Sequence, residues 1–172
     1  MYQRYTTNTD RSSTEQLLVS ESVERAVAAV DIPDVAGRKV AVEVVSVDRG
    51  AEFYDDRPYV QSAIEHRLRR AGAVIVPAEA ADLIVLARVG AVGTVSRQLA
   101  LGIPNLNINF YTSAKHHGYT KLRLVTTDPA SGAMVAQSEP VMKSSRHDYW
   151  SLLQFIVWHQ DIYPDVHAVD ID

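Results

Sequence analysis

Histidines are the first residues of this sequence to consider for chemistry, because imidazole binds metals and transfers protons near neutral pH. The chain has six histidines and no cysteine. His116 and His117 are adjacent and would point to opposite faces of a strand, while His147, His159 and His167 are 12 and 8 residues apart. None of these spacings matches the HxxxH or HExxH patterns of zinc sites. We therefore predict structural or surface histidines, with no metal ion and no cofactor.

Carboxylates and hydroxyls give no clearer indication of a reaction. Asp55 and Asp56 are paired, as in acid–base or hard-cation sites, but they precede a predicted helix whose N-terminus they would cap. Ser131 lies before Gly132 in a turn sequence and not in a G-x-S-x-G elbow. The Gly90–Gly93 stretch lacks the Lys-Ser/Thr of a phosphate loop and indicates a bent strand. We expect no catalytic residue and no enzyme activity.

The overall composition is that of a globular protein with no strong preference for polyanions. The chain has 172 residues, of which 47% are hydrophobic and 22% charged, and its net charge is −4. This length favours one domain, and the acidic balance argues against nucleic-acid binding. We predict a flexible segment over 1–13, a single α/β domain over 14–164 and a tail over 165–172.

The first half of the sequence predicts a β-α-β arrangement. A capping box over Ser13–Gln16 opens a helix over 14–30. A β-branched run over 39–47 predicts a central strand, and Asp55–Pro58 starts a helix that ends at Gly72. Strands are expected over 73–77 and 83–89, the second running on to residue 95. Such a succession favours parallel strands joined by a right-handed crossover.

The second half predicts antiparallel structure and a last helix. Residues 97–118 look irregular, 119–127 alternate as a strand, 128–132 form a turn, and 133–138 return as the hairpin partner. Residues 149–163 have near-helical apolar spacing. The predicted fold is therefore α/β with an α+β tendency: a mixed sheet of about five to six strands, an early β-α-β unit, a C-terminal antiparallel hairpin and two to three helices.

Aromatic residues are concentrated near the C-terminus. Trp150, Phe155, Trp158 and Tyr163 include both tryptophans of the chain. A helix that is apolar on two sides must bury both, one of them against its own sheet. Two interpretations stay open: core packing alone, or core packing together with a contact to another subunit or to a membrane surface. We take these four residues as the hypothetical interface.

A ligand-binding site is the alternative to an interface. The polar loop over 105–111 and the histidine pair would line it, with Asn107, Tyr111, His116 and His117 as the binding residues. A small ligand or a polysaccharide would be the bound species.

Five motifs resemble an uncharacterised family of predicted bacterial envelope lipoproteins, over roughly residues 6–138. They are the Thr14-Glu-Gln-Leu-Leu18 helix start, Gly37-Arg-Lys-Val-Ala-Val42, Tyr59-Val-Gln-Ser-Ala-Ile64, Ala81-Asp-Leu-Ile-Val85 and Gly90-Ala-Val-Gly-Thr94. At the level of the fold the pattern is similar to the TolB N-terminal domain and to lipoprotein subunits of curli and exopolysaccharide export.

The resemblance implies a non-enzymatic structural or assembly protein of the cell envelope that acts through self-association or through a protein partner. It implies a periplasmic location, at the outer membrane if a leader and a lipobox cysteine have been removed, with the cytoplasm as the alternative. A homo-oligomer or an envelope partner is expected, and a membrane surface is a further partner to test.

Overall fold

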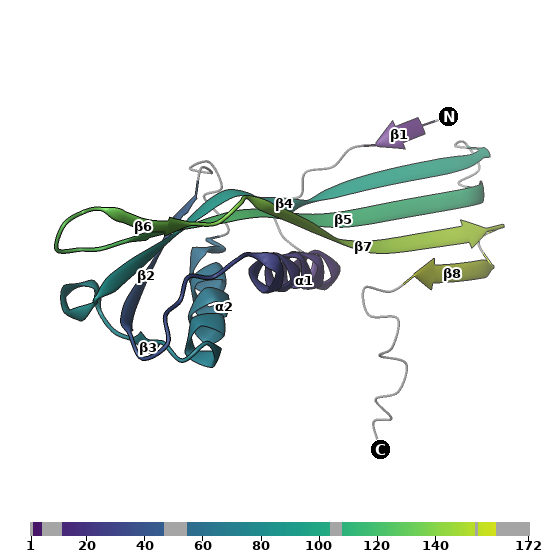
Figure 1. Cartoon of the computed structure of the whole chain (residues 1–172). Coiled ribbons are helices and arrows are strands. Elements are labelled where there is room, and N and C mark those ends of the chain that lie inside the picture. Colours follow the sequence, from purple (N-terminus) through teal and green to yellow (C-terminus); the bar gives the residue numbers. More distant parts are fainter. Residues whose placement is uncertain (1, 5–11, 47–54, 104–107, 154, 161–172) are drawn as a thin grey trace, which may run out of the picture. The chain divides into compact units, whose positions relative to one another are not determined.

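The computed structural model describes residues 2–4, 12–46, 55–103, 108–153 and 155–160. These residues form one mixed sheet of eight strands in the order β3-β2-β4-β5-β7-β8, with β1 paired to β4 and β6 paired to β5 (Figure 1). The predicted fold class, a mixed sheet with helices and an early β-α-β unit, is confirmed. The elements are β1 (Tyr2–Arg4), α1 (Ser13–Ala29), β2 (Lys39–Ser46), α2 (Arg57–Arg70), β3 (Val74–Ile75), the short 3₁₀ helix η1 (Ala78–Ala80), β4 (Leu83–Ile103), β5 (Ile108–Thr127), β6 (Met134–Gln137), β7 (Val141–Leu152) and β8 (Ile156–Gln160).

The chain divides into two compact units. Unit 1 comprises the described residues within Met1–Glu21, Thr94–Gly118 and Ser144–Asp172, and unit 2 comprises those within Ser22–Gly93 and Tyr119–Lys143. Helix α1 and strands β4, β5 and β7 contribute residues to both units.

Unit 2 is built on the predicted β-α-β arrangement. Strand β2 pairs in parallel with β3, Lys39 opposite Val74, and with β4, Val40 opposite Leu83. Helix α2 connects β2 to β3 and lies alongside them (Figure 1). Its buried residues Val60, Ile64 and Leu68 follow the i, i+4, i+8 spacing of one helix face. The sequence prediction of this unit is therefore confirmed.

The apolar core lies mostly in unit 2. Its fully buried side chains come from α1, α2, three strands and the segment between α1 and β2, as expected when helices cover a sheet. Inside it, the Ser22 hydroxyl lies 2.8 Å from that of Thr120, so these two buried polar groups satisfy each other. The largest members are Val23, Val30, Val35, Val40, Val60, Ile64, Leu68, Val85, Leu122 and Leu124.

The predicted hairpin of unit 2 is also present. Strand β6 pairs antiparallel with β5, and Val125 lies opposite Gln137. In the turn, Asp128 Oδ1 accepts a hydrogen bond from Ala130 N at 2.8 Å, and Gly132 has a φ of +69° that favours glycine.

The N-terminus of α1 is capped one residue earlier than predicted. Glu15 N donates to Ser12 Oγ at 3.3 Å, and Ser12 N donates to Glu15 Oε2 at 2.9 Å. This reciprocal pair is a capping box with Ser12 as the N-cap. Because a carboxylate takes the N3 position, Ser13 and Gln16 are not the capping pair.

The N-terminus of α2 corrects a second prediction. Asp56 occupies the N-cap position but makes no side-chain capping hydrogen bond. Asp55 Oδ1 instead accepts from Arg57 N at 3.1 Å, and the same carboxylate pairs with the Arg57 guanidinium at 2.6 Å. The preceding acidic residues Asp48 and Glu52 lie outside the described part of the chain.

Two predictions for the strands of unit 1 were wrong. Residues 97–118 are not irregular, because β4 runs to Ile103 and β5 begins at Ile108. Residues 149–160 are not helical, because Tyr149–Leu152 belong to β7 and Ile156–Gln160 form β8. Alternation of side chains across these strands, combined with non-local pairing, prevails over the near-helical spacing.

Helix α1 approaches strands β5 and β7 closely in unit 1. Ser145 Oγ donates to the Leu18 carbonyl at 2.5 Å. A Cβ added at Gly118 would lie 2.6 Å from Ser145 Oγ and would overlap the same Leu18 carbonyl. Glycine at position 118 therefore permits this approach.

Candidate interaction surface

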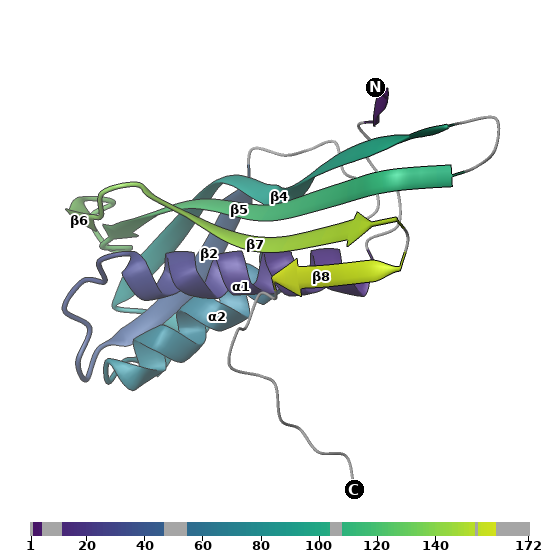
Figure 2. The same cartoon turned by 90° about the vertical axis from the view of Figure 1, so that its right-hand side faces the viewer.

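The β7–β8 hairpin brings the two tryptophans together. In this hairpin, whose two strands lie side by side in Figure 2, Trp150 is paired with Trp158 and Leu152 with Ile156. Directly paired and alternate residues of antiparallel strands share one face of the sheet. These four side chains therefore form an aromatic and aliphatic group on a single face.

Most of this group and its neighbours are open to solvent. The exposed fraction is 89% for Phe155, 54% for Ile156 and 46% for Trp158. Leu152, Leu153 and Val157 are exposed as well. Exposed apolar surface of this kind is a candidate site of association.

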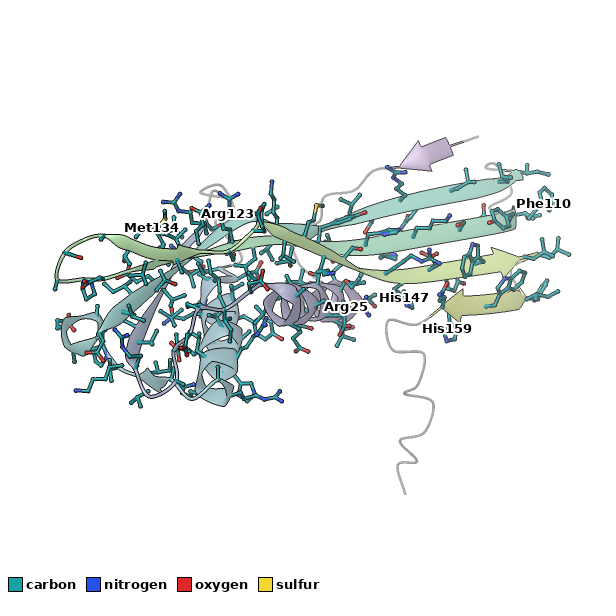
Figure 3. The ribbon with its side chains drawn as sticks, viewed as in Figure 1. Arg25, Phe110, Arg123, Met134, His147 and His159 are labelled. Carbon is teal, nitrogen blue, oxygen red and sulfur yellow. The ribbon has the colours of Figure 1, made fainter. Side chains whose placement is uncertain are left out.

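The unit 1 part of β4 and the first residues of β5 add further exposed apolar residues. Figure 3 shows Phe110 near the start of β5. Like Phe110, the other members are each more than one-third exposed: Val95, Leu101, Ile103 and Ile108.

In the strands of unit 1, polar side chains are buried and apolar side chains are exposed, which is the opposite of a normal core. In the unit 1 parts of β5 and β7, the buried side chains are small or charged: Ser113, Ser145, Asp148 and Ser151. Asp148 is 2% exposed and its Oδ2 pairs with Arg146 Nε at 3.1 Å, while its Oδ1 has no hydrogen-bond partner among the described residues. The exposed apolar side chains of these strands therefore form the candidate interaction surface.

Strand β8 stands at the end of the strand order, with β7 as its neighbour. An edge strand presents unpaired backbone N–H and C=O groups that can pair with another chain. Proteins usually protect such edges with lysine, proline or inward-pointing charges. The sequence of β8, Ile-Val-Trp-His-Gln, contains none of these residues.

Three histidines lie side by side on neighbouring strands of unit 1. The ring centroids of His116 and His147 are 6.4 Å apart. Those of His147 and His159, which are labelled in Figure 3, are 6.5 Å apart. His116 Nδ1 lies 2.7 Å from Ser96 Oγ. Burial, together with the neighbouring His147, lowers the pKa of His116. The described residues contain no cluster of three or more ligands suited to a metal ion.

The residues predicted to bind a ligand do not converge on one site. Tyr111, His116 and His117 all lie on β5 instead of around a loop. Alternation places Tyr111 and His117 on one face and His116 on the other. At about 3.4 Å per residue, Tyr111 and His117 are roughly 20 Å apart. Asn107, like the predicted interface residue Tyr163, lies outside the described residues.

Sequence reasoning missed the apolar residues at the ends of β4 and β5. The alternation of Leu99, Leu101 and Ile103 with small residues, and of Ile108 and Phe110 with Asn109, is a strand pattern that would have identified them.

Comparison with known protein families assigns the chain to one of them. A model for a family of unknown function, DUF6655, matches residues 3–152. The chain belongs to this family. A comparison with curated proteins finds no match. Among the described residues of this chain, no helix is long and apolar enough to cross a membrane.

Proposed function

We propose that this DUF6655 protein is a non-enzymatic assembly component that associates with further copies of itself through the β7–β8 hairpin. The supporting observation is the reversed burial in unit 1, where serines and Asp148 are inside and Phe155, Ile156 and Trp158 are outside. Removing apolar surface from water provides the main driving force for association.

The apolar side chains of the hairpin supply part of what a specific dimer needs. Leu152, Ile156 and Trp158 share one face of the hairpin, Leu153 and Phe155 lie in its turn, and each of the five is at least 39% exposed. A standard interface buries roughly 800 Å² per partner, so backbone and polar atoms of the β8 edge would supply the remainder.

The composition of the β8 edge favours a second copy as the partner. Antiparallel pairing of β8 with itself about a two-fold axis would continue the sheet and satisfy the backbone groups of both edges. The strand has no lysine, arginine or carboxylate that would oppose a like charge in its copy. We place the two-fold axis at a residue within Ile156–Trp158.

Light scattering over a concentration series tests the proposal. The wild-type protein is expected to form a discrete oligomer that dissociates only on strong dilution. The double variant Ile156→Thr/Trp158→Thr keeps the β propensity of the strand, removes apolar area and should shift the protein to monomer. Val135→Thr, at an exposed position of β6, is the matched control and should leave the oligomer unchanged.

Cysteine cross-linking tests the two-fold pairing, because the chain has no cysteine of its own. Single cysteines at each position from 156 to 160 should give one strongly linked dimer, at the residue on the axis. Equal linking at all positions, or a wild-type protein that stays monomeric, would contradict the proposal. Sedimentation of that monomer with lipid vesicles would assign the apolar surface to a membrane instead.

The cellular setting that we propose is the bacterial envelope, on the basis of the sequence resemblance. Fractionation of the native host should recover the protein with the envelope. Recovery in the cytosolic fraction alone would overturn this setting but would leave the self-association proposal standing.

A further inference from the structure

Unit 2 contains a groove between α1 and α2 that the association proposal does not use. Its volume is about 820 Å³. Tyr59 of α2 donates its hydroxyl proton to Glu24 Oε1 of α1 at 2.9 Å and so ties the two helices together at the groove. The volume lies within the range of small-molecule sites, which are roughly 300–1,000 Å³.

The groove carries an excess of positive charge. Arg67 and Arg70, both in the last turn of α2, line it, and Glu24 is the acidic residue among the described lining residues. Among the described residues, the buried Arg67 Nη1 atom has no hydrogen-bond partner. Leaving a buried charged donor unsatisfied is costly, and such groups normally have a protein or solvent partner. An anion in the groove would supply that partner once the Arg67 guanidinium turns towards it.

The remaining lining includes the polar residues Ser62 and His66 and a set of apolar side chains. Val27 and Ala28 of α1, Ala63 of α2 and Ile32 contribute methyl and methylene groups. A free inorganic anion would leave this surface in contact with water. An anion that also has a hydrocarbon body would cover the surface and pair with the arginines.

We propose that this groove binds an amphipathic anion, a carboxylate carried on an aliphatic chain, with Arg67 and Arg70 holding the carboxylate. The apolar side chains beside them hold the aliphatic chain. This proposal is independent of self-association through β8, since every residue of the groove belongs to unit 2.

Calorimetric titration of the full chain with laurate, below its micelle concentration, tests the site. Saturable binding with one site per chain is expected. Arg67→Gln and Arg70→Gln should each weaken it about tenfold, the size expected for loss of a charged hydrogen bond. Glu24→Gln keeps an acceptor for the Tyr59 hydroxyl, removes a negative charge and should strengthen binding.

Arg69→Gln is the matched control. It removes the same charge from the same helix turn, but Arg69 pairs with Glu65 at 3.0 Å and does not line the groove. Its affinity for laurate should equal that of the wild type. Thermal melting of each variant confirms that the fold is intact.

Four outcomes would overturn the proposal, and the first three concern laurate, the variants and a neutral analogue. These are absence of saturable laurate binding, equal weakening in Arg69→Gln and Arg67→Gln, and equal affinity for laurate and neutral dodecanol. Equal affinity for laurate and inorganic phosphate would also overturn it, because the apolar wall would then contribute nothing.

Discussion

At the scale of single residues, close packing decides which side chains are allowed where α1 meets the strands of unit 1. Gly118 has no room for a methyl group beside Ser145 Oγ and the Leu18 carbonyl. The serine hydroxyl that occupies this space also satisfies a helix carbonyl. Gly118 and Ser145 together therefore allow the close contact between the strands and the Leu18 carbonyl of α1.

We expect Gly118→Ala to lower the free energy of unfolding by about 1–3 kcal/mol, since overpacking forces neighbouring atoms apart. Gly93→Ala is the matched control, because a Cβ there would meet nothing within 4 Å. Urea unfolding at neutral pH compares the two. Equal stability of both variants would show that α1 moves away at no cost.

His116 should make stability depend on pH. Its pKa is lowered from 6.5, first by burial and then by His147, while Glu15 and Asp148 act in the opposite direction and His117 adds to the lowering. Its unfolded form therefore binds a proton more readily than its folded form. The folding stability linked to His116 is therefore greatest above the pKa of this histidine in the unfolded state. It decreases as the pH falls through that value towards the lower pKa of the folded state.

The measurement is the urea midpoint of unfolding at about pH 5 and about pH 7.5, on either side of the unfolded histidine pKa. The wild type should lose more stability at the lower pH than His116→Gln, which keeps a hydrogen-bonding group near Ser96. The same change in both proteins would mean that other groups carry the pH dependence.

At the scale of elements, predictions from sequence succeeded where the determinants are local. Helix α1, the β2-α2-β3 unit and the turn over 128–132 each depend on caps, glycines and apolar periods within a few residues. The β7–β8 hairpin was missed because Trp150, Leu153 and Val157 also fit a helical period. Pairing of Trp150 with Trp158, a contact between strands, decides the outcome.

The candidate surface was anticipated only in part for the same reason. Aromatic content alone pointed to Phe155 and Trp158, whose exposure depends on the strand conformation of β8. The contributions of Leu101, Ile103, Ile108 and Phe110 required knowing that β4 and β5 extend to these residues. Their role as an interface stays a prediction.

The start of α2 should depend on Asp55 more than on Asp56. The Arg57 side chain, through its hydrogen bonds to this carboxylate, lowers the pKa of Asp55. Asp55→Asn should therefore weaken the protein above the unfolded pKa of aspartate, and the difference from wild type should shrink as pH falls through the lowered, folded pKa.

Asp56→Asn is the comparison, since Asp56 makes no side-chain capping hydrogen bond. Urea unfolding at neutral and acidic pH should separate the two variants. A larger loss of stability in Asp56→Asn than in Asp55→Asn would contradict the assignment.

At the scale of the whole molecule, the two units differ in what stabilises them. Unit 2 holds most of the buried aliphatic side chains, whereas the strands of unit 1 bury small polar groups. Local stability follows the density of buried apolar contacts. We expect the strands of unit 1 to open more readily unless other molecules cover them.

Hydrogen exchange should therefore depend on protein concentration in unit 1 only. Peptides that cover Ile156–Gln160 should gain protection as concentration rises, while peptides that cover Lys39–Ser46 should stay protected throughout. Mass spectrometry of exchanged peptides at two concentrations measures this. Unchanged exchange in β8 would argue against association through that strand.

The position of β8 in the sequence has a consequence during synthesis. Every strand and helix of unit 2 precedes it, so the ribosome releases the uncharged edge only after the core-forming segments have emerged. An exposed apolar strand that emerged early would compete with those segments for pairing partners while they are still unfolded. Because β8 appears late, the nascent chain can bury its core before the strand that we propose to pair with a second copy becomes available.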